Sequence, residues 1–170
     1  MALYSKVVED KTILELVKDR KNILVIGCGG CINESLAYDK KVSIFKKIDG
    51  RRIAYATHRE LKRVSELLSS KECRVKVLEE YDFREHCEEG FLCIRKRGVD
   101  FNLLEKLGDF IPDVILSLCC TAGTYGLEDT HNNDVPIIQI AKPIGMLGYL
   151  YYDEDDERKI DFGHTKVIPI

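Results

Sequence analysis

The sequence lacks any long hydrophobic run, and its longest apolar stretches, such as residues 114–120, are far too short to cross a bilayer. It also lacks an excess of either charge, because 26 Lys and Arg residues stand against 29 Asp and Glu residues, for a formal net charge of −3. This balance gives no electrostatic basis for binding nucleic acid or an anionic membrane. No secretory hydrophobic segment precedes the charged Lys6, Glu9 and Asp10. We therefore expect a cytoplasmic protein that binds neither nucleic acid nor membranes.

Linkers, repeats and recognisable catalytic sets are missing as well. No stretch rich in Pro, Gly or Ser divides the 170 residues, and no internal repeat is visible. We therefore expect a single α/β domain over residues 1–170, long enough to bury a core without disulfides. No Ser-His-Asp spacing, pair of catalytic carboxylates or phosphate-binding loop can be identified, so independent enzymatic activity is the least expected function.

Apolar runs alternate with helical patterns along the chain. Continuous or alternating apolar residues predict strands at 22–26, 74–78, 113–118 and 135–140. Helical periodicity predicts helices at 10–19, around 102–107 and from Thr57 onwards, where Thr57 and Glu60 have the spacing of a capping box. Hairpins are expected at 42–56, around Asp49-Gly50, and within 149–170. This order predicts a mainly parallel sheet with flanking helices, Rossmann- or flavodoxin-like, plus one or two β-hairpins.

Cysteine, by contrast, is plentiful. An odd number of cysteines without a signal peptide argues against a disulfide framework, because the cytosol keeps thiols reduced. In a parallel sheet the loops after the strands share one edge, where open α/β sheets bind their ligands. Cys73 precedes a strand and is expected to be an ordinary thiol at the opposite edge. The other six cysteines map to the shared edge: Cys28 and Cys31 after the first expected strand, Cys87 and Cys93 after the second, and Cys119 and Cys120 after the third.

The segment Cys28-Gly29-Gly30-Cys31 has a two-residue gap that lets both sulfurs face one metal ion or cluster. Its glycines leave backbone N–H groups free to hydrogen-bond sulfur, and the start of the next helix adds partial positive charge. A redox dithiol is the alternative interpretation of this motif. Cys119 and Cys120 point opposite ways on an extended chain, so at least one of them is expected to be a core residue.

The identity of the metal stays open at this point. Structural zinc sites usually show two paired knuckles. Here one CxxC is joined by widely spaced single cysteines, with His86 as an alternative ligand, and this mixed pattern suits an iron–sulfur cluster better than zinc.

Three segments together resemble a known family: residues 23–31, the stretch around His86-Cys87, and residues 113–123. They are similar to the small iron–sulfur subunit of the methylenetetrahydrofolate reductases of acetogens and related organisms, also seen as the C-terminal domain called MTHFR_C. The resemblance runs from about residue 22 to residue 148. It implies a non-catalytic subunit of an oxidoreductase, which pairs with a flavin-bearing methylenetetrahydrofolate reductase subunit and carries electrons.

The resemblance also implies a ligand set for a 4Fe–4S cluster. By position, Cys28 and Cys31 match the first pair of the family, and Cys120, rather than Cys119, matches the cysteine after the third strand. Cys87 matches the middle cysteine, with Cys93 as its substitute. The cysteine-rich tail of longer members has no counterpart here, so a second cluster is not expected. The alternative is a zinc-stabilised scaffold subunit of a folate complex without redox activity, held by the same cysteines.

Overall fold

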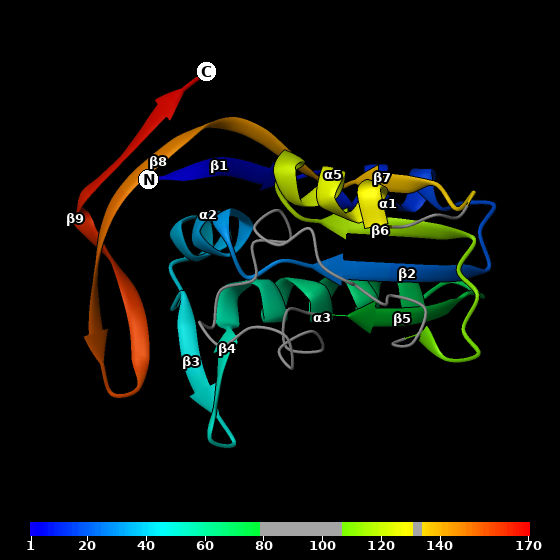
Figure 1. Ribbon diagram of the computed structural model, residues 1–170, viewed down its shortest axis with the longest axis horizontal. Coiled ribbons are helices and arrows are strands. Elements are labelled where there is room, and N and C mark those ends of the chain that lie inside the picture. Colours follow the sequence, from blue (N-terminus) through cyan, green and yellow to red (C-terminus); the bar gives the residue numbers. More distant parts are fainter. Residues whose placement is uncertain (79–106, 131–133) are drawn as a thin grey trace.

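The fold consists of two sheets and four helices in the residues that the computed structural model describes, 1–78, 107–130 and 134–170 (Figure 1). Cys87, Cys93, His86 and the helix expected around 102–107 lie wholly or mostly outside these ranges. None of the helices in the described part of the chain is long and apolar enough to span a membrane.

The first sheet has four parallel strands. They are β2 (Asn22–Gly27), β5 (Arg74–Leu78), β6 (Val114–Leu118) and β7 (Ile137–Gln139), in the order β5-β2-β6-β7. Every residue of β6 is buried, as are the five residues that follow Asn22 in β2. Helices cover the sheet, so these strands read as continuous apolar runs. The strands and the α/β class predicted from the sequence are confirmed.

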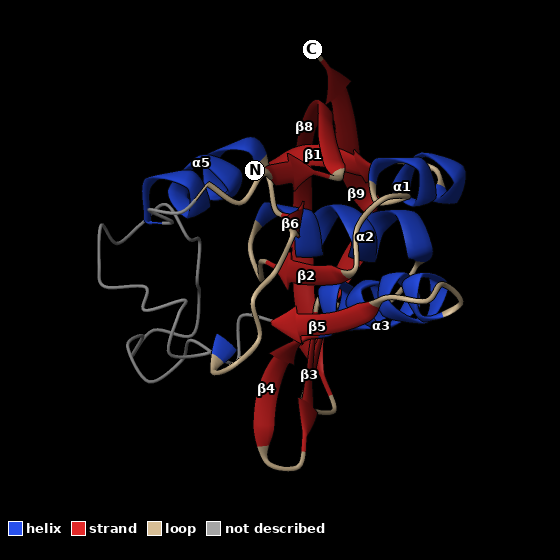
Figure 2. Cartoon of the chain, turned by 90° about the vertical axis from the view of Figure 1, so that its right-hand side faces the viewer, coloured by secondary structure: helices blue, strands red, loops and turns tan. Residues whose placement is uncertain are grey.

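Helices flank the parallel sheet on both sides. Figure 2 shows α1 (Asp10–Leu16), α2 (Cys31–Lys40) and α3 (Tyr55–Ser69) on one side, with α5 (Thr121–Thr130) on the other. Apolar residues of α3 at helical spacing face the sheet, with Leu61 and Val64 buried in the main core. Cys28 directly follows the carboxyl end of β2, and Cys119 directly follows that of β6.

The second sheet is larger than the hairpins that we expected. Its five strands are β1 (Ala2–Val7), β8 (Ala141–Glu154), β9 (Glu157–Pro169), β3 (Phe45–Ile48) and β4 (Arg51–Ala54), in the antiparallel order β1-β8-β9-β3-β4. The sequence pattern did not predict β1, and it placed the start of the last hairpin near residue 149 rather than at Ala141.

The part of β8 that the sequence pattern did not predict, residues 141–148, contains residues that usually mark loops. Pro143 lies opposite Ser5, next to a register shift between Tyr4 and Ser5, and such irregularities are where strands tolerate proline. At Gly145 an added Cβ would lie 2.6 Å from the carbonyl oxygen of Ile168, so only glycine allows β8 and β9 to approach this closely. Pro143 thus lies beside a strand irregularity and Gly145 at a close strand contact, and neither marks a turn.

Both hairpins turn on two residues with positive φ. In the β3–β4 hairpin Asp49 and Gly50 have φ of 49° and 76°, as a type I′ turn requires, which confirms the predicted hairpin. In the long β8–β9 hairpin Asp155 and Asp156 have φ of 48° and 62°. The acidic run therefore forms the tip of a hairpin.

The predicted capping box at Thr57 is wrong. Helix α3 begins at Tyr55, and its N-cap residue makes no side-chain capping bond. The Thr57 hydroxyl instead donates to the carbonyl oxygen of Cys28 (3.0 Å), and the Thr57 amide donates to the side-chain oxygen of Asn33 (2.9 Å). Glu60 binds cations and does not reach back to the N-cap. Long-range partners thus replace the local capping interactions that the spacing predicted.

Candidate functional site

The cysteines gather where the order of the parallel strands reverses. From β2 the chain crosses to β5 on one side, and then returns to β6 on the other side of β2. The connections therefore leave the carboxyl ends of β2 and β6 in opposite directions, the arrangement at which open α/β sheets bind their ligands, and we call this place the crevice. The amide of Cys28 donates to the carbonyl oxygen of Leu118 (3.2 Å) and joins the two loops at this point.

Cys28 follows β2 directly and is 1% exposed. The amide of Gly30 donates to its sulfur at 3.4 Å, an interaction that stabilises a thiolate or a metal-bound sulfur. The bond that Thr57 donates to the Cys28 carbonyl fixes the backbone of the same residue. At Gly27 an added Cβ would lie 2.6 Å from Leu61 Cδ1, so glycine lets α3 pack close against this loop.

Cys31 and Cys120 meet across the crevice. Cys31 is the first residue of α2 and is half-buried, whereas Cys120 lies just before α5 and is buried. Their thiols form a hydrogen bond with each other, and this bond together with burial raises the pKa of Cys31 well above its ordinary value. The Cys31 thiol is thus held protonated, and a metal ion that binds it must displace the proton.

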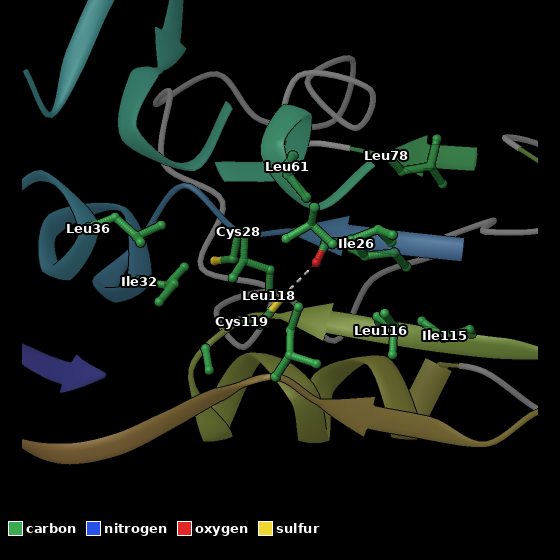
Figure 3. Packing of buried hydrophobic residues seen from close by; sticks show 14 of the residues in the cluster. Ile26, Cys28, Ile32, Leu36, Leu61, Leu78, Ile115, Leu116, Leu118 and Cys119 are labelled. Carbon is green, nitrogen blue, oxygen red and sulfur yellow. Dashed lines mark hydrogen bonds between the residues drawn. The ribbon is translucent and has the colours of Figure 1, made fainter. Parts of the chain in front are cut away.

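The neighbouring residues Cys119 and Cys120 make different contacts. Cys119 belongs to the main core, with its sulfur 3.9 Å from the carbonyl oxygen of Ile26 (Figure 3). The Cys120 thiol is hydrogen-bonded to the Cys31 thiol. At Gly123 an added Cβ would lie 2.9 Å from Cys119 Cβ, and 3.8 and 4.0 Å from the two sulfurs. Glycine therefore allows the first turn of α5 to lie against both cysteines.

Cys73 lies away from this group, just before β5 at the amino end of the sheet. Its thiol donates to the carbonyl oxygen of Leu68 at 3.2 Å, and burial raises its pKa. This cysteine can serve as a control for experiments on the others.

The donor set suits a soft metal, although the described residues do not complete a site. Within residues 1–78, 107–130 and 134–170, no group of three or more His, Cys, Asp or Glu side chains is arranged to hold a metal ion. The structure brings together the thiols of Cys31 and Cys120, and places Cys28 at the same crevice. Thiolate sulfur is the donor that zinc and iron–sulfur clusters prefer. Cys87 and Cys93 lie outside the described residues.

Sequence reasoning missed two polar groups beside Cys31. Glu34 lies one turn along α2, and burial raises its pKa against the opposing effect of a hydrogen bond from Tyr149. Burial and this carboxylate raise the pKa of Tyr149 in turn, well above its ordinary value. The signal for Glu34 was its position three residues after Cys31, on the same helix face. Tyr149 lies in β8, at the start of the hairpin that the sequence predicted, but the pattern gave no sign that this hairpin reaches α2.

Comparison with known proteins identifies no relative: no family model matches the chain, and neither a curated protein nor a solved structure is significantly similar to it.

Proposed function

We propose that the chain is a non-catalytic, electron-carrying subunit with one iron–sulfur cluster, partner to a flavin-bearing methylenetetrahydrofolate reductase. The observation that carries the proposal is the placement of Cys28, Cys31 and Cys120 at one crevice, with the Cys31 and Cys120 thiols in contact. The resemblance of residues 23–31, 86–87 and 113–123 to the small subunit of these reductases supplies the partner and the reaction.

The finer fold assignment belongs to the same proposal. In chain order the four parallel strands run 2-1-3-4, which matches the first four strands of the flavodoxin-like order 2-1-3-4-5. Flavodoxin-like sheets bind their redox cofactor at the first reversal of strand order. A redox centre beyond β2 and β6 fits this rule.

In this proposal Cys28, Cys31, Cys87 and Cys120 hold the cluster, and Cys93 is the substitute for Cys87. Cys119 stays in the core. A bound cluster would supply one-electron transfer. The chain itself binds and orients: the Gly30 amide hydrogen-bonds the Cys28 sulfur, and the thiol protons of the cysteines leave on binding.

The half-buried Cys31 fits electron transfer at a subunit interface. Cys31 is partly exposed, whereas Cys28 and Cys120 are buried. We expect the partner subunit to cover the surface around the start of α2, because electron transfer requires the two cofactors to lie close together.

The test is electron transfer in an anaerobically purified complex with the flavoprotein subunit. Stopped-flow absorbance would follow reduction of this chain by the reduced flavin of its partner. We expect Cys28→Ala and Cys120→Ala to abolish the transfer, and Cys73→Ala to leave it unchanged. Transfer that survives in both Cys28→Ala and Cys120→Ala contradicts the proposal.

A zinc-stabilised scaffold is the second candidate, and one observation favours it. The cysteines come from the ends of β2 and β6 and the start of α2, so a bound metal would cross-link elements that are far apart in sequence. Such a site would stabilise the folded state directly. In that case a chelator should lower the thermal midpoint of the purified protein, and an unchanged midpoint would contradict this function.

A further inference from the structure

A second recess lies at the opposite end of α2 from the cysteines. It is a cavity of about 370 Å³ between the loop after α2, the first turns of α3 and the β8–β9 hairpin. Helix α2 spans ten residues, or about 15 Å at 1.5 Å per residue, so this recess is separate from the crevice. Its lining residues are Lys41, Val42, Ser43, Lys46, Tyr55, Arg59, Tyr152, Lys159, Ile160 and Phe162. We call it the α2–hairpin pocket.

Four cationic side chains line this pocket in a chain whose formal net charge is −3. Lys46 is paired with Glu157 (2.6 Å) and Lys159 with Glu154 (2.7 Å). Lys41 and Arg59 form no ion pair with the described residues. As far as the described residues go, these two cations of the pocket are therefore available for an anionic ligand.

Aromatic rings stand beside these two cations. The Lys41 ammonium lies 4.0 Å from the ring centroid of Phe162, and the Arg59 guanidinium lies 5.9 Å from that of Tyr55. Phe162 and Tyr152 are 41% and 47% exposed. Large exposed rings at a concave surface mark binding sites more often than isolated surface residues do. The pocket thus combines an anion-binding side with an apolar side suited to a planar group.

We propose that the α2–hairpin pocket binds a nucleoside diphosphate or a ligand of the same class, with its phosphates on Lys41 and Arg59 and its base against Phe162 and Tyr152. Arginine and lysine are the usual phosphate-binding side chains, and bases stack on aromatic rings. The cavity has the size of a small-molecule site, and the net negative charge of the chain disfavours an extended nucleic acid. The proposal is independent of the function of the cysteines.

The test is equilibrium binding of ADP to the full-length protein, with inorganic pyrophosphate and adenosine as competitors. We expect saturable binding below about 1 mM. Arg59→Ala and Phe162→Ala should each weaken it by about tenfold, since each removes a phosphate or stacking contact. Lys18→Ala, an exposed lysine after α1, and Tyr125→Ala, an exposed tyrosine on α5, are the matched controls and should change nothing.

Circular dichroism of each variant would confirm that it folds, as expected for exposed side chains. The proposal is overturned if ADP shows no saturable binding below about 1 mM. It is also overturned if Arg59→Ala and Phe162→Ala bind as wild type does. Pyrophosphate that binds as tightly as ADP, with Phe162→Ala neutral, would show an anion site without base recognition and would overturn the nucleotide assignment.

Discussion

Glu60 offers a sharp test of how the helices are held together. Its carboxylate is 2% exposed and binds Lys40 at the end of α2 (2.6 Å) and Arg63 one turn along α3 (2.8 Å). Arg63 also reaches Asp10 at the start of α1 (2.5 Å). Three helices therefore meet at one buried charge. Replacing Glu60 by Gln keeps its size but removes that charge.

The expected cost follows from the environment of the carboxylate. Burial acts to raise the pKa of Glu60, but the hydrogen bonds that Arg63 and Lys40 donate outweigh it and hold the pKa below its ordinary value of 4.5. Hydrogen bonds to charged groups contribute about 1.5–3 kcal/mol. The Lys40 and Arg63 side chains are 43% and 36% exposed, so solvent screens their share. We therefore expect Glu60→Gln to lower the free energy of unfolding by about 1–2 kcal/mol at pH 7.

The direction of the pKa shift of Glu60 determines how its contribution to stability changes with pH. Because the pKa is lower in the folded state than in the unfolded state, ionised Glu60 stabilises the fold above pH 4.5. That contribution is lost as the pH falls through the folded-state pKa, where the protonated side chain resembles Gln. The difference between wild type and Glu60→Gln in urea unfolding should then vanish at low pH. Glu15→Gln is the control: Glu15 is 70% exposed in its pair with Lys18, so it should cost less than about 0.5 kcal/mol. Equal stabilities at pH 7, or a difference that does not change with pH, would refute the reasoning.

Two further predictions concern the crevice itself. Gly27→Ala places a methyl group 2.6 Å from Leu61 Cδ1 and 2.7 Å from Thr57 Cγ2, and should destabilise the fold by about 1–3 kcal/mol in thermal or urea denaturation; wild-type stability would show that α3 moves away freely. In metal-free protein Cys31 should react slowly with iodoacetamide at neutral pH, because the hydrogen bond to the Cys120 thiol raises the pKa of Cys31. Cys120→Ala removes this hydrogen bond and should accelerate the reaction. Mass spectrometry of the alkylated peptides measures this rate, and an unchanged rate in Cys120→Ala would contradict the contact.

The parallel sheet could be predicted from sequence because its strands carry a strong local signal. Residues 22–27 and 114–118 are apolar runs bounded by Gly, Asp or Cys, and burial on both faces explains them. The Asp49-Gly50 turn was equally clear, because positive φ at two consecutive residues restricts which residue types occur there. The loops that carry the cysteines followed from the strands.

The second sheet could not be predicted, because its information is long-range. Strand β1 pairs with β8, whose partner residues are about 140 positions away in the sequence. Pro143 and Gly145 in β8 look like loop residues until their partners are known. The same applies to Thr57, whose spacing to Glu60 suggested a local cap, whereas its partners are Asn33 and the Cys28 backbone.

The hydrogen bond between the Cys31 and Cys120 thiols also could not be predicted from the sequence pattern. The CxxC spacing suggested that the sulfurs of Cys28 and Cys31 would face one metal ion or cluster. In the structure the Cys31 thiol is hydrogen-bonded to the Cys120 thiol, and the Gly30 amide donates a hydrogen bond to the Cys28 sulfur. Strand order decided this, since it sets β2 beside β6 and brings the two loops together.

The most direct test of the metal centre is the iron, zinc and acid-labile sulfide content of anaerobically purified protein, measured together with its visible absorption. Wild type and Cys73→Ser should contain iron and sulfide in nearly equal amounts, with absorption that falls on reduction, and Cys120→Ser should lose both. About one zinc per chain without sulfide would contradict the electron carrier and favour the scaffold. Neither metal in wild type, or full iron and sulfide in Cys120→Ser, would contradict a metal centre at this crevice.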